Sequence, residues 1–369
     1  MGIPEKIKAI QDEMARTQIN KATEHHIGLL KAKIAKLKRE QEEVAAKKSA
    51  AKSDGFDVRR AGDATVVFIG LPSVGKSTLL NKLTGARSAV GAFQFTTLTV
   101  VPGMMEYRGA RIQVLDLPGI IKGASTGRGL GKRILSVARS ADLVLLILDV
   151  FQPYHEGVLV GELGNIGIRL NQLPPNITIE RAGSGGIAVA QQVKLTKITE
   201  KHVRDLLHLY GISSARVVTR EDVTSEQLAD HIAGNVSYSK SLTVLNKIDL
   251  VDDRFLTEAK GRLSSEVVQV SANSETNIGA LKERIYEKLE FIRIYMRPKG
   301  GQTDYEEPLI ARRGDTVEDV CNKLHRRMRA DFRYAMVWGE SVKFGGQRVG
   351  LGHRLLDEDV LTIIKKRGA

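Results

Sequence analysis

Short apolar runs alternate with segments of helical periodicity between Ala64 and about residue 290. A strand that is buried on both faces is a continuous apolar run, and helices between such strands make them parallel. The pattern therefore predicts an α/β domain over residues 64–290 with a mostly parallel sheet. Its expected strands are ATVVFIG, TLTVVPGMMEY, RIQVLDLPG, DLVLLILDV, SLTVLNKID and EVVQVSA.

Two of these runs are joined differently from the others. Only a short segment containing Gly109 separates TLTVVPGMMEY from RIQVLD. Because connections this short join antiparallel neighbours, we expect an antiparallel pair at one edge of the sheet.

Two apolar stripes at helical spacing precede the α/β domain, one starting at Ile3 and the other at Ile27. Thr23 is a suitable N-cap for the second helix. Helices that fold back on each other bury both stripes, so residues 1–48 are expected to form a helical hairpin. The charged segment over residues 49–63, rich in small residues, is expected to be a linker.

The alternation is interrupted after Asp149, because about 90 residues pass before the next core strand. Connections in α/β domains usually have about 2–6 residues, so we expect an inserted α/β subdomain at about 152–238. Its predicted strands are NITIER and GIAVAQQ, and its predicted helices are TEKHVRDLLHLY and TSEQLADHIAG.

The last segment, 291–369, has a mixed pattern that predicts a small α+β domain with a helix begun at Thr316. It contains the Arg-rich stretch HRRMRADFR, which is followed by Tyr334. Two interpretations of this stretch remain open: RNA binding through phosphates and stacked bases, or a solvated helix face.

Composition narrows the class of protein. The formal net charge of +13 and the isoelectric point near 9.7 favour polyanionic partners such as ribosomes or RNA. A single cysteine, Cys321, excludes an internal disulfide framework and is expected to be buried. No apolar run approaches about 20 residues and the first residues lack an apolar signal core, so we expect a cytoplasmic protein without a membrane partner.

The stretch GLPSVGKS matches the phosphate-binding pattern G-x-x-x-x-G-K-[ST] between an expected strand and an expected helix. Gly70 and Gly75 permit a tight turn whose N–H groups meet phosphate oxygens. Lys76 supplies a charge for the β and γ phosphates, and Ser77 offers a hydroxyl to Mg²⁺. The predicted nucleotide-binding residues of this loop are Gly70, Ser73, Val74, Gly75, Lys76, Ser77 and Thr78.

A second motif, DLPG, follows the strand RIQVLD. Asp116 is expected to reach Mg²⁺, and the backbone N–H of Gly119 to sense the γ-phosphate. Alone, the pattern D-x-x-G is weak, because it recurs in ordinary turns. Its position after the antiparallel edge pair makes it informative.

Two further motifs point to guanine. In NKID, the carboxylate of Asp249 matches the N1–H and the amino group of guanine, whereas adenine offers no such donors. Lys247 is expected to lie along the base, and Asn246 to tie this loop to the phosphate-binding loop. In SAN, Ser271 and Ala272 follow another strand, and the N–H of Ala272 is suited to guanine O6.

With these residues in place, the chain resembles the Obg-like group of translation-factor-related GTPases, and within it the DRG family of developmentally regulated GTP-binding proteins. The match includes FQFTTLTVVPG, DLPGIIKGASTGRGLGKRIL, the N-terminal KATEHHIGLLKAKIAKLKRE and the C-terminal VWGESVKFGGQRVGLGHRLLDEDVLTI. The resemblance implies a helix-turn-helix N-terminus, a GTPase domain with its insertion, and a C-terminal TGS domain of β-grasp type. It also implies association with ribosomes and a partner of the DRG-family regulatory protein class.

The hydrolytic machinery is expected to use Lys76, Thr97 and Gly119. Thr96 and Thr97 are both suited to Mg²⁺ when GTP is bound, and the resemblance favours Thr97. Ile120 stands where many small GTPases carry a Gln that orients water, so slow intrinsic turnover is expected. Help could come from a partner's arginine or from K⁺, although Ser73 replaces the Asn found in several K⁺-using relatives.

These expectations define a Mg²⁺-dependent GTP hydrolase that converts GTP to GDP and phosphate and acts as a switch in cytoplasmic translation. The alternative from another class is a scaffold that binds RNA or ribosomes and whose nucleotide is only structural.

Overall fold

The computed structural model describes residues 2–18, 23–49, 61–85, 101–117, 137–234, 236–325 and 327–366. Contacts between residues divide the chain into two compact units. One contains the N-terminal helices together with residues 167–238, and the other contains residues 57–166 and 239–369. In the described part of the chain, no helix is long and apolar enough to cross a membrane.

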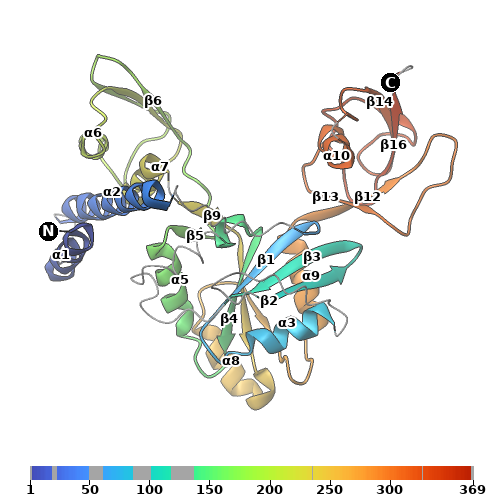
Figure 1. Ribbon diagram of the computed structural model, residues 1–369, viewed down its shortest axis with the longest axis horizontal. Coiled ribbons are helices and arrows are strands. Elements are labelled where there is room, and N and C mark those ends of the chain that lie inside the picture. Colours follow the sequence, from blue (N-terminus) through green and yellow to red (C-terminus); the bar gives the residue numbers. More distant parts are fainter. Residues whose placement is uncertain are drawn as a thin grey trace. The chain divides into compact units, whose positions relative to one another are not determined.

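The second unit is built around a six-stranded sheet with the order β11-β10-β4-β1-β3-β2 (Figure 1). All neighbouring strands in it are parallel except β2, which runs antiparallel to β3 at the edge. Both predictions about this sheet are therefore confirmed. The strands are β1 (Ala64–Ile69), β2 (Val101–Tyr107), β3 (Ala110–Asp116), β4 (Leu143–Asp149), β10 (Ser241–Asn246) and β11 (Val267–Gln269).

The central strands are buried on both faces, as their continuous apolar sequences predict. Every residue of β1 and β10 is buried. The helices of this part are α3 (Lys76–Thr84), α5 (His155–Asn165), α8 (Asp253–Gly261) and α9 (Ile278–Lys288), with the short 3₁₀ helix η2 (Ile248–Leu250) after β10. Since α5 packs against β4, it belongs to this unit, and the residues grouped with the N-terminal helices begin at 167, later than the expected boundary near 152.

The same unit contains a second, five-stranded sheet with the order β13-β12-β16-β14-β15 and the helix α10 (Val317–Leu324). Thr316 caps α10, as predicted, and Cys321 is buried in its core. The strands are β12 (Phe291–Met296), β13 (Leu309–Arg312), β14 (Phe332–Trp338), β15 (Gln347–Val349) and β16 (Val360–Lys365).

The Arg-rich stretch near residue 330 is not a helix in the part that the structure describes. Turns occupy residues 327–330, and Phe332 begins β14 with its side chain buried in the core. The solvated helix face considered for this stretch is therefore wrong. Arg326 lies outside the described residues.

The first unit combines α1 (Ile3–Arg16) and α2 (Glu24–Ser49) with a segment from the middle of the chain. Contacts between α1 and α2 confirm the helical hairpin, and α2 also packs on α6 and α7. The middle segment contributes the three-stranded sheet β6-β8-β7 and the pair β5-β9. Its elements are β5 (Ile168–Leu170), β6 (Ile177–Arg181), β7 (Ile187–Gln191), α6 (Glu200–Leu209), β8 (Ala215–Thr219), α7 (Ser225–Ala233) and β9 (Ser237–Ser239).

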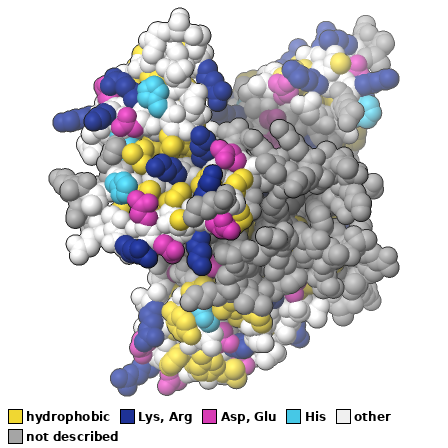
Figure 2. Space-filling model, turned by 60° about the vertical axis from the view of Figure 1, so that its left-hand side comes forward, with side chains coloured by type: hydrophobic (Ala, Val, Ile, Leu, Met, Phe, Trp, Pro, Cys, Tyr) yellow, Lys and Arg dark blue, Asp and Glu magenta, His cyan; other side chains and the backbone are white. Residues whose placement is uncertain are grey.

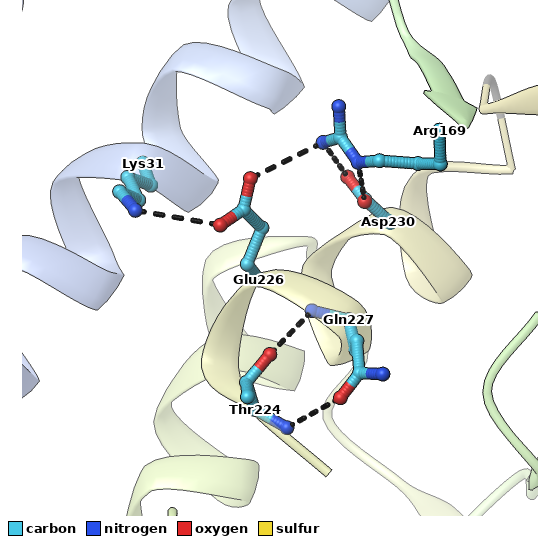
Figure 3. Close-up of polar contacts among 6 residues, drawn as sticks. All are labelled: Lys31, Arg169, Thr224, Glu226, Gln227 and Asp230. Carbon is cyan, nitrogen blue, oxygen red and sulfur yellow. Dashed lines mark hydrogen bonds and ion pairs between the residues drawn. The ribbon is translucent and has the colours of Figure 1, made fainter. Parts of the chain in front are cut away.

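Polar contacts fasten α2 to α7 (Figure 3). Glu226 accepts hydrogen bonds from Lys31 of α2 at 3.4 Å and from Arg169 of β5 at 3.3 Å. Arg169 also pairs with the buried Asp230, at 2.8 Å. Thr224 caps α7 and exchanges hydrogen bonds with Gln227, which fixes the first turn of that helix.

Candidate nucleotide-binding site

The loop between β1 and α3 can form only with glycine at two positions. A Cβ atom on Gly75, whose φ is +92°, would lie 2.4 Å from Nδ2 of Asn246. A Cβ atom on Gly70 would lie 2.5 Å from the carbonyl oxygen of Ile147. The two motif glycines are therefore required by close packing on β10 and β4 as well as by the turn itself.

Lys76 is buried at the start of α3, and its ammonium group closes the loop. Nζ donates hydrogen bonds to the carbonyl oxygens of Leu71 at 2.9 Å and Gly70 at 3.2 Å. Burial lowers the pKa of Lys76, and the charge of Asp116 opposes that shift. These carbonyls hold the ammonium group where the sequence motif expects a phosphate contact.

Ser77 and Asp116 meet where the first turn of α3 faces the end of β3. Oγ of Ser77 donates to Oδ2 of Asp116 at 2.7 Å, while the buried Oδ1 has no hydrogen-bond partner among the described residues. Burial raises the pKa of Asp116, and the contacts with Ser77 and Lys76 act against this shift. An unsatisfied buried carboxylate oxygen beside a hydroxyl fits the oxygen ligands that Mg²⁺ prefers.

Asn246 joins the loop after β10 to the phosphate-binding loop, as predicted. Its Nδ2 donates to the carbonyl oxygen of Val74 at 2.9 Å, and its Oδ1 accepts the N–H of Ala272 at 3.0 Å. The predicted contact of Ala272 with guanine O6 would compete with this hydrogen bond and stays a prediction. Three segments that are far apart in sequence thus meet at one buried side chain.

Asp149 contacts the NKID segment from the neighbouring strand β4, and the sequence motifs did not include it. Its Oδ2 lies 2.7 Å from Nζ of Lys247, and its Oδ1 accepts the N–H of Phe151 at 3.0 Å. Lys247 has a φ of +68°, in the left-handed region that costs non-glycine residues energy. A carboxylate at the end of a parallel strand, beside the strand that precedes NKID, was the signal for this contact.

One cavity of about 330 Å³ is lined by residues of three of the motif segments, GLPSVGKS, NKID and SAN. Its walls include the phosphate-binding loop, the exposed Asp249 in η2, and the loop after β11. That last loop is closed by the buried Ser271, which accepts the N–H of Ser274 at 3.1 Å. The lining residues are Ser73, Gly75, Lys76, Ser77, Thr78, Asn246, Lys247, Asp249, Ser271, Ala272 and Asn273.

Several residues expected to act in hydrolysis lie outside the described part of the chain. These are Thr96, Thr97, Gly119 and Ile120, together with the Gly-rich run after them. Their predicted roles stay predictions.

Comparisons with known proteins agree with this geometry. The family described as 50S ribosome-binding GTPase matches residues 65–179, and the C-terminal region of that domain matches residues 184–291. A TGS domain matches residues 292–365. Fold and site together define a P-loop GTPase with a C-terminal TGS domain, as predicted.

Similarity to individual proteins extends over the whole chain. An uncharacterized GTP-binding protein of Methanocaldococcus jannaschii is 53% identical, covering 100% of this chain and 94% of its own. The developmentally-regulated GTP-binding protein 2 homolog of Dictyostelium discoideum is 47% identical, covering 99% and 100%. The chain therefore belongs to the family of developmentally regulated GTP-binding proteins. Among solved structures, the YchF GTPase of Schizosaccharomyces pombe is 13% identical with a TM-score of 0.45, covering 83% of this chain and 99% of its own.

Proposed function

We propose that this protein hydrolyses GTP to GDP and phosphate and acts as a nucleotide-controlled switch on ribosomes during cytoplasmic translation. The observation that carries the proposal is the convergence of the phosphate-binding loop, Asn246 and Asp249 on one cavity, with Asp116 hydrogen-bonded to Ser77 of that loop. A site that merely bound phosphate would not need a carboxylate set for the guanine edge. Support for the ribosome comes from the family description and from the net charge of +13.

The phosphate side of the site suits charge stabilisation. Lys76, Ser77 and Thr78 at the start of α3 line the cavity, and both the N–H groups of a helix N-terminus and an ammonium group favour bound phosphate oxygens. Ser77 and Asp116 would hold Mg²⁺, which supplies positive charge to the β and γ phosphates when it is bound. Lys76 would exchange its carbonyl acceptors for phosphate oxygens, and Thr97 and Gly119 would complete the γ-phosphate contacts.

Slow intrinsic hydrolysis is part of this proposal, because Ile120 has no group that orients water. K⁺ or an arginine from a partner would then supply the missing stabilisation. Ser73 lines the cavity with a φ of +63° and brings a hydroxyl oxygen to the phosphate side. Single-turnover rates in K⁺ and in Na⁺ at equal ionic strength test the cation, and equal rates would exclude it.

The partner in this proposal is a protein of the DRG-family regulatory class, which would stabilise the GTPase. Its support is the family membership of the chain. Thermal unfolding of the GTPase with and without such a partner measures the effect directly.

The switch is tested by sedimentation of purified ribosomes with the protein bound to a GTP analogue, bound to GDP, or free of nucleotide. A switch predicts a clear difference between these forms, and Ser77→Ala, which removes a Mg²⁺ ligand, should abolish that difference. Equal sedimentation of all three forms would overturn the switch and favour the scaffold whose nucleotide is structural.

A further inference from the structure

One buried carboxylate near the six-stranded sheet has no place in the nucleotide site described above. On the described surface seen in Figure 2, acidic side chains lie among Lys and Arg side chains. Glu156, in the first turn of α5, is by contrast only 6% exposed. Among the described residues, no Lys, Arg or His nitrogen lies within ion-pair distance of its carboxylate. A carboxylate placed away from water without a cation is unfavourable unless several hydrogen bonds compensate it.

Three donors from two neighbouring segments supply this compensation. Oε1 of Glu156 accepts hydrogen bonds from the hydroxyl of Thr243 at 3.2 Å and from the hydroxyl of Ser265. Oε2 accepts the backbone N–H of Ser264 at 2.8 Å. Thr243 is a fully buried residue of β10, whereas Ser264 and Ser265 lie just before β11. Glu156 therefore joins α5 both to β10 and to the segment that enters β11.

The strand β11 is short and lies at the edge of the sheet. It has three residues, which pair with β10 as Val267 with Thr243, Val268 with Val244 and Gln269 with Leu245. A ladder this short specifies its register weakly, and a slip by one residue would move the strand by about 3.3 Å. Because Glu156 binds Thr243 and Ser265 through the same oxygen, it fixes the two strands to each other at one end of the ladder.

The register of β11 decides where the SAN segment lies, because that segment follows the strand directly. The N–H of Val270 donates to the carbonyl oxygen of Leu245 at 2.9 Å. The N–H of Ala272 lies 3.0 Å from Oδ1 of Asn246. A displacement of about 3.3 Å along the strand would break both hydrogen bonds. The SAN and NKID segments therefore keep their mutual geometry only while β11 keeps its register.

We infer that Glu156 is a positioning residue for guanine recognition, because it holds β11 in register on β10 and so places the N–H of Ala272 for guanine O6. A carboxylate can accept three donors at once, whereas an amide of the same size has one oxygen and two N–H groups. Glu156 does not line the cavity, so it acts only through the two strands. Its role rests on the proposed contact of Ala272 with O6.

Two analogues of GDP test this role, because each changes one group on the edge of guanine. Thioguanosine diphosphate carries sulfur, a weak hydrogen-bond acceptor, in place of O6, and inosine diphosphate lacks the amino group that Asp249 is expected to bind. The parent protein should bind each analogue about tenfold more weakly than GDP, because each loses one hydrogen bond to the base. Competition against fluorescently labelled GDP, on the full chain with Mg²⁺, gives the three affinities.

The variant Glu156→Gln keeps the size of the side chain, but its amide turns an N–H group toward one of the three donors. GDP should bind about tenfold more weakly to this variant, whereas the sulfur analogue should bind about as it does to the parent. The loss of affinity caused by sulfur should therefore fall to about twofold or less. The loss caused by inosine should stay unchanged, because Asp249 follows β10, which is also paired with β4 along its whole length.

Asp230→Asn is the matched control for a loss of stability. Asp230 is buried to a similar extent, at 7% exposed, but it pairs with Arg169 in the other unit. Its neutralisation should lower thermal stability and leave the effects of sulfur and of inosine as they are in the parent.

Ser265→Ala is a milder second variant, because it removes a single donor on the β11 side. It should reduce the effect of sulfur in the same direction as Glu156→Gln. Thermal unfolding shows whether each variant is folded, and Ser265→Ala carries the test if Glu156→Gln is not.

An unchanged effect of sulfur in the folded variants would overturn the positioning role of Glu156. So would an equal fall of the sulfur and inosine effects, since a general loosening of the base site does not single out O6. A reduced effect of sulfur in Asp230→Asn would also overturn it, because the cause would then be lost stability. If the parent binds the sulfur analogue as tightly as GDP, the contact of Ala272 with O6 fails and the role of Glu156 fails with it. The switch on ribosomes is decided separately, by sedimentation.

Discussion

Asp116 is buried at the end of β3, beside the hydroxyl of Ser77. Its buried Oδ1 is unsatisfied, and burial raises the pKa of Asp116 above its ordinary value of 3.8. A carboxyl whose pKa is raised by folding stabilises the protein most when it is protonated. Its contribution to stability therefore falls as the pH rises from about 3.8 toward the folded-state pKa, and stays lower above it.

We expect Asp116→Asn to raise the free energy of unfolding of the nucleotide-free protein at neutral pH by about 1 kcal/mol, because the buried charge is removed. The same change should weaken Mg²⁺-dependent nucleotide binding. Thermal unfolding at pH 4 and pH 7 measures the first effect, and the difference between parent and variant should shrink at the lower pH. A variant that is less stable than the parent protein at neutral pH would contradict the raised pKa of Asp116.

Asp149 pairs with Lys247, whose side chain we expect to lie along the base. We expect Asp149→Asn to weaken the binding of GDP and of xanthosine diphosphate about equally, by about tenfold, because the expected contact of the Lys247 stem is the same for either base. Asp249→Asn should instead exchange guanine for xanthine preference, since it reverses the hydrogen-bonding edge. Isothermal titration with both nucleotides separates the two residues.

Glu275→Gln is the control for this experiment. Glu275 forms an exposed ion pair with Lys82 of α3 at 2.6 Å, so its neutralisation removes a similar charge without reaching Lys247. If Glu275→Gln weakened GDP binding as much as Asp149→Asn does, the effect would come from the change in net charge. The positioning role of Asp149 would then be abandoned.

At the scale of elements, the β2-β3 hairpin connects the nucleotide site to the C-terminal sheet. β3 ends at Asp116, and the turn at the other end packs Gly109 against Pro308, just before β13. A Cβ atom on Gly109, whose φ is +82°, would lie 2.6 Å from Cγ of Pro308. The turn of the hairpin therefore packs directly against the start of the C-terminal sheet.

We expect Gly109→Ala to lower the free energy of unfolding by about 2 kcal/mol, through backbone strain and the clash with Pro308. Gly314→Ala is the matched control, because Gly314 has a φ of +96° and nothing within 4 Å of an added Cβ. Chemical denaturation should show the smaller loss for Gly314→Ala. When it is added to Gly109→Ala, Pro308→Ala should restore part of the lost free energy of unfolding. If it does not, backbone strain at position 109 is the whole cause of the loss.

Many of the helices and strands could be predicted from the sequence. Mostly apolar runs predict β1, β4 and β10 because a strand covered on both faces has no positions that face water. The Thr316 cap and the glycines of the phosphate loop are local signals as well. The secondary structure of residues 327–334 was harder to predict, because an Arg-rich stretch with few apolar positions has no clear hydrophobic period. Only the packing of Phe332 in the core shows where β14 begins.

At the scale of the whole molecule, the N-terminal helices form one unit with residues 167–238. Ala32 of α2 is fully buried in the same apolar cluster as Val203 and Leu228. The hydroxyl of Tyr210 donates to the carbonyl oxygen of Ala32 at 3.1 Å. Residues of α2 are therefore part of the core of the middle segment, and the two should lose their structure together.

We expect Ala32→Glu to reduce hydrogen-exchange protection in α2, α6 and α7, because a buried charge without a partner costs several kcal/mol. Protection of β1 and β10 should stay unchanged, since they belong to the other unit. Lys33→Glu places the same side chain at the next, exposed position of α2 and should change protection little. Loss of protection throughout the chain would show that the two units do not unfold separately.

The sequence by itself determined the guanine-nucleotide motifs, most strands and helices, and the family. These depend on short spacings, such as Gly70 to Ser77, that fold into the same local geometry wherever they occur. The tertiary structure decided which distant residues meet: Asp149 with Lys247, α2 with α7, and Arg348 with Tyr334. Such contacts depend on how whole helices and strands pack. A local hydrophobic period or motif spacing does not indicate which surfaces will come together.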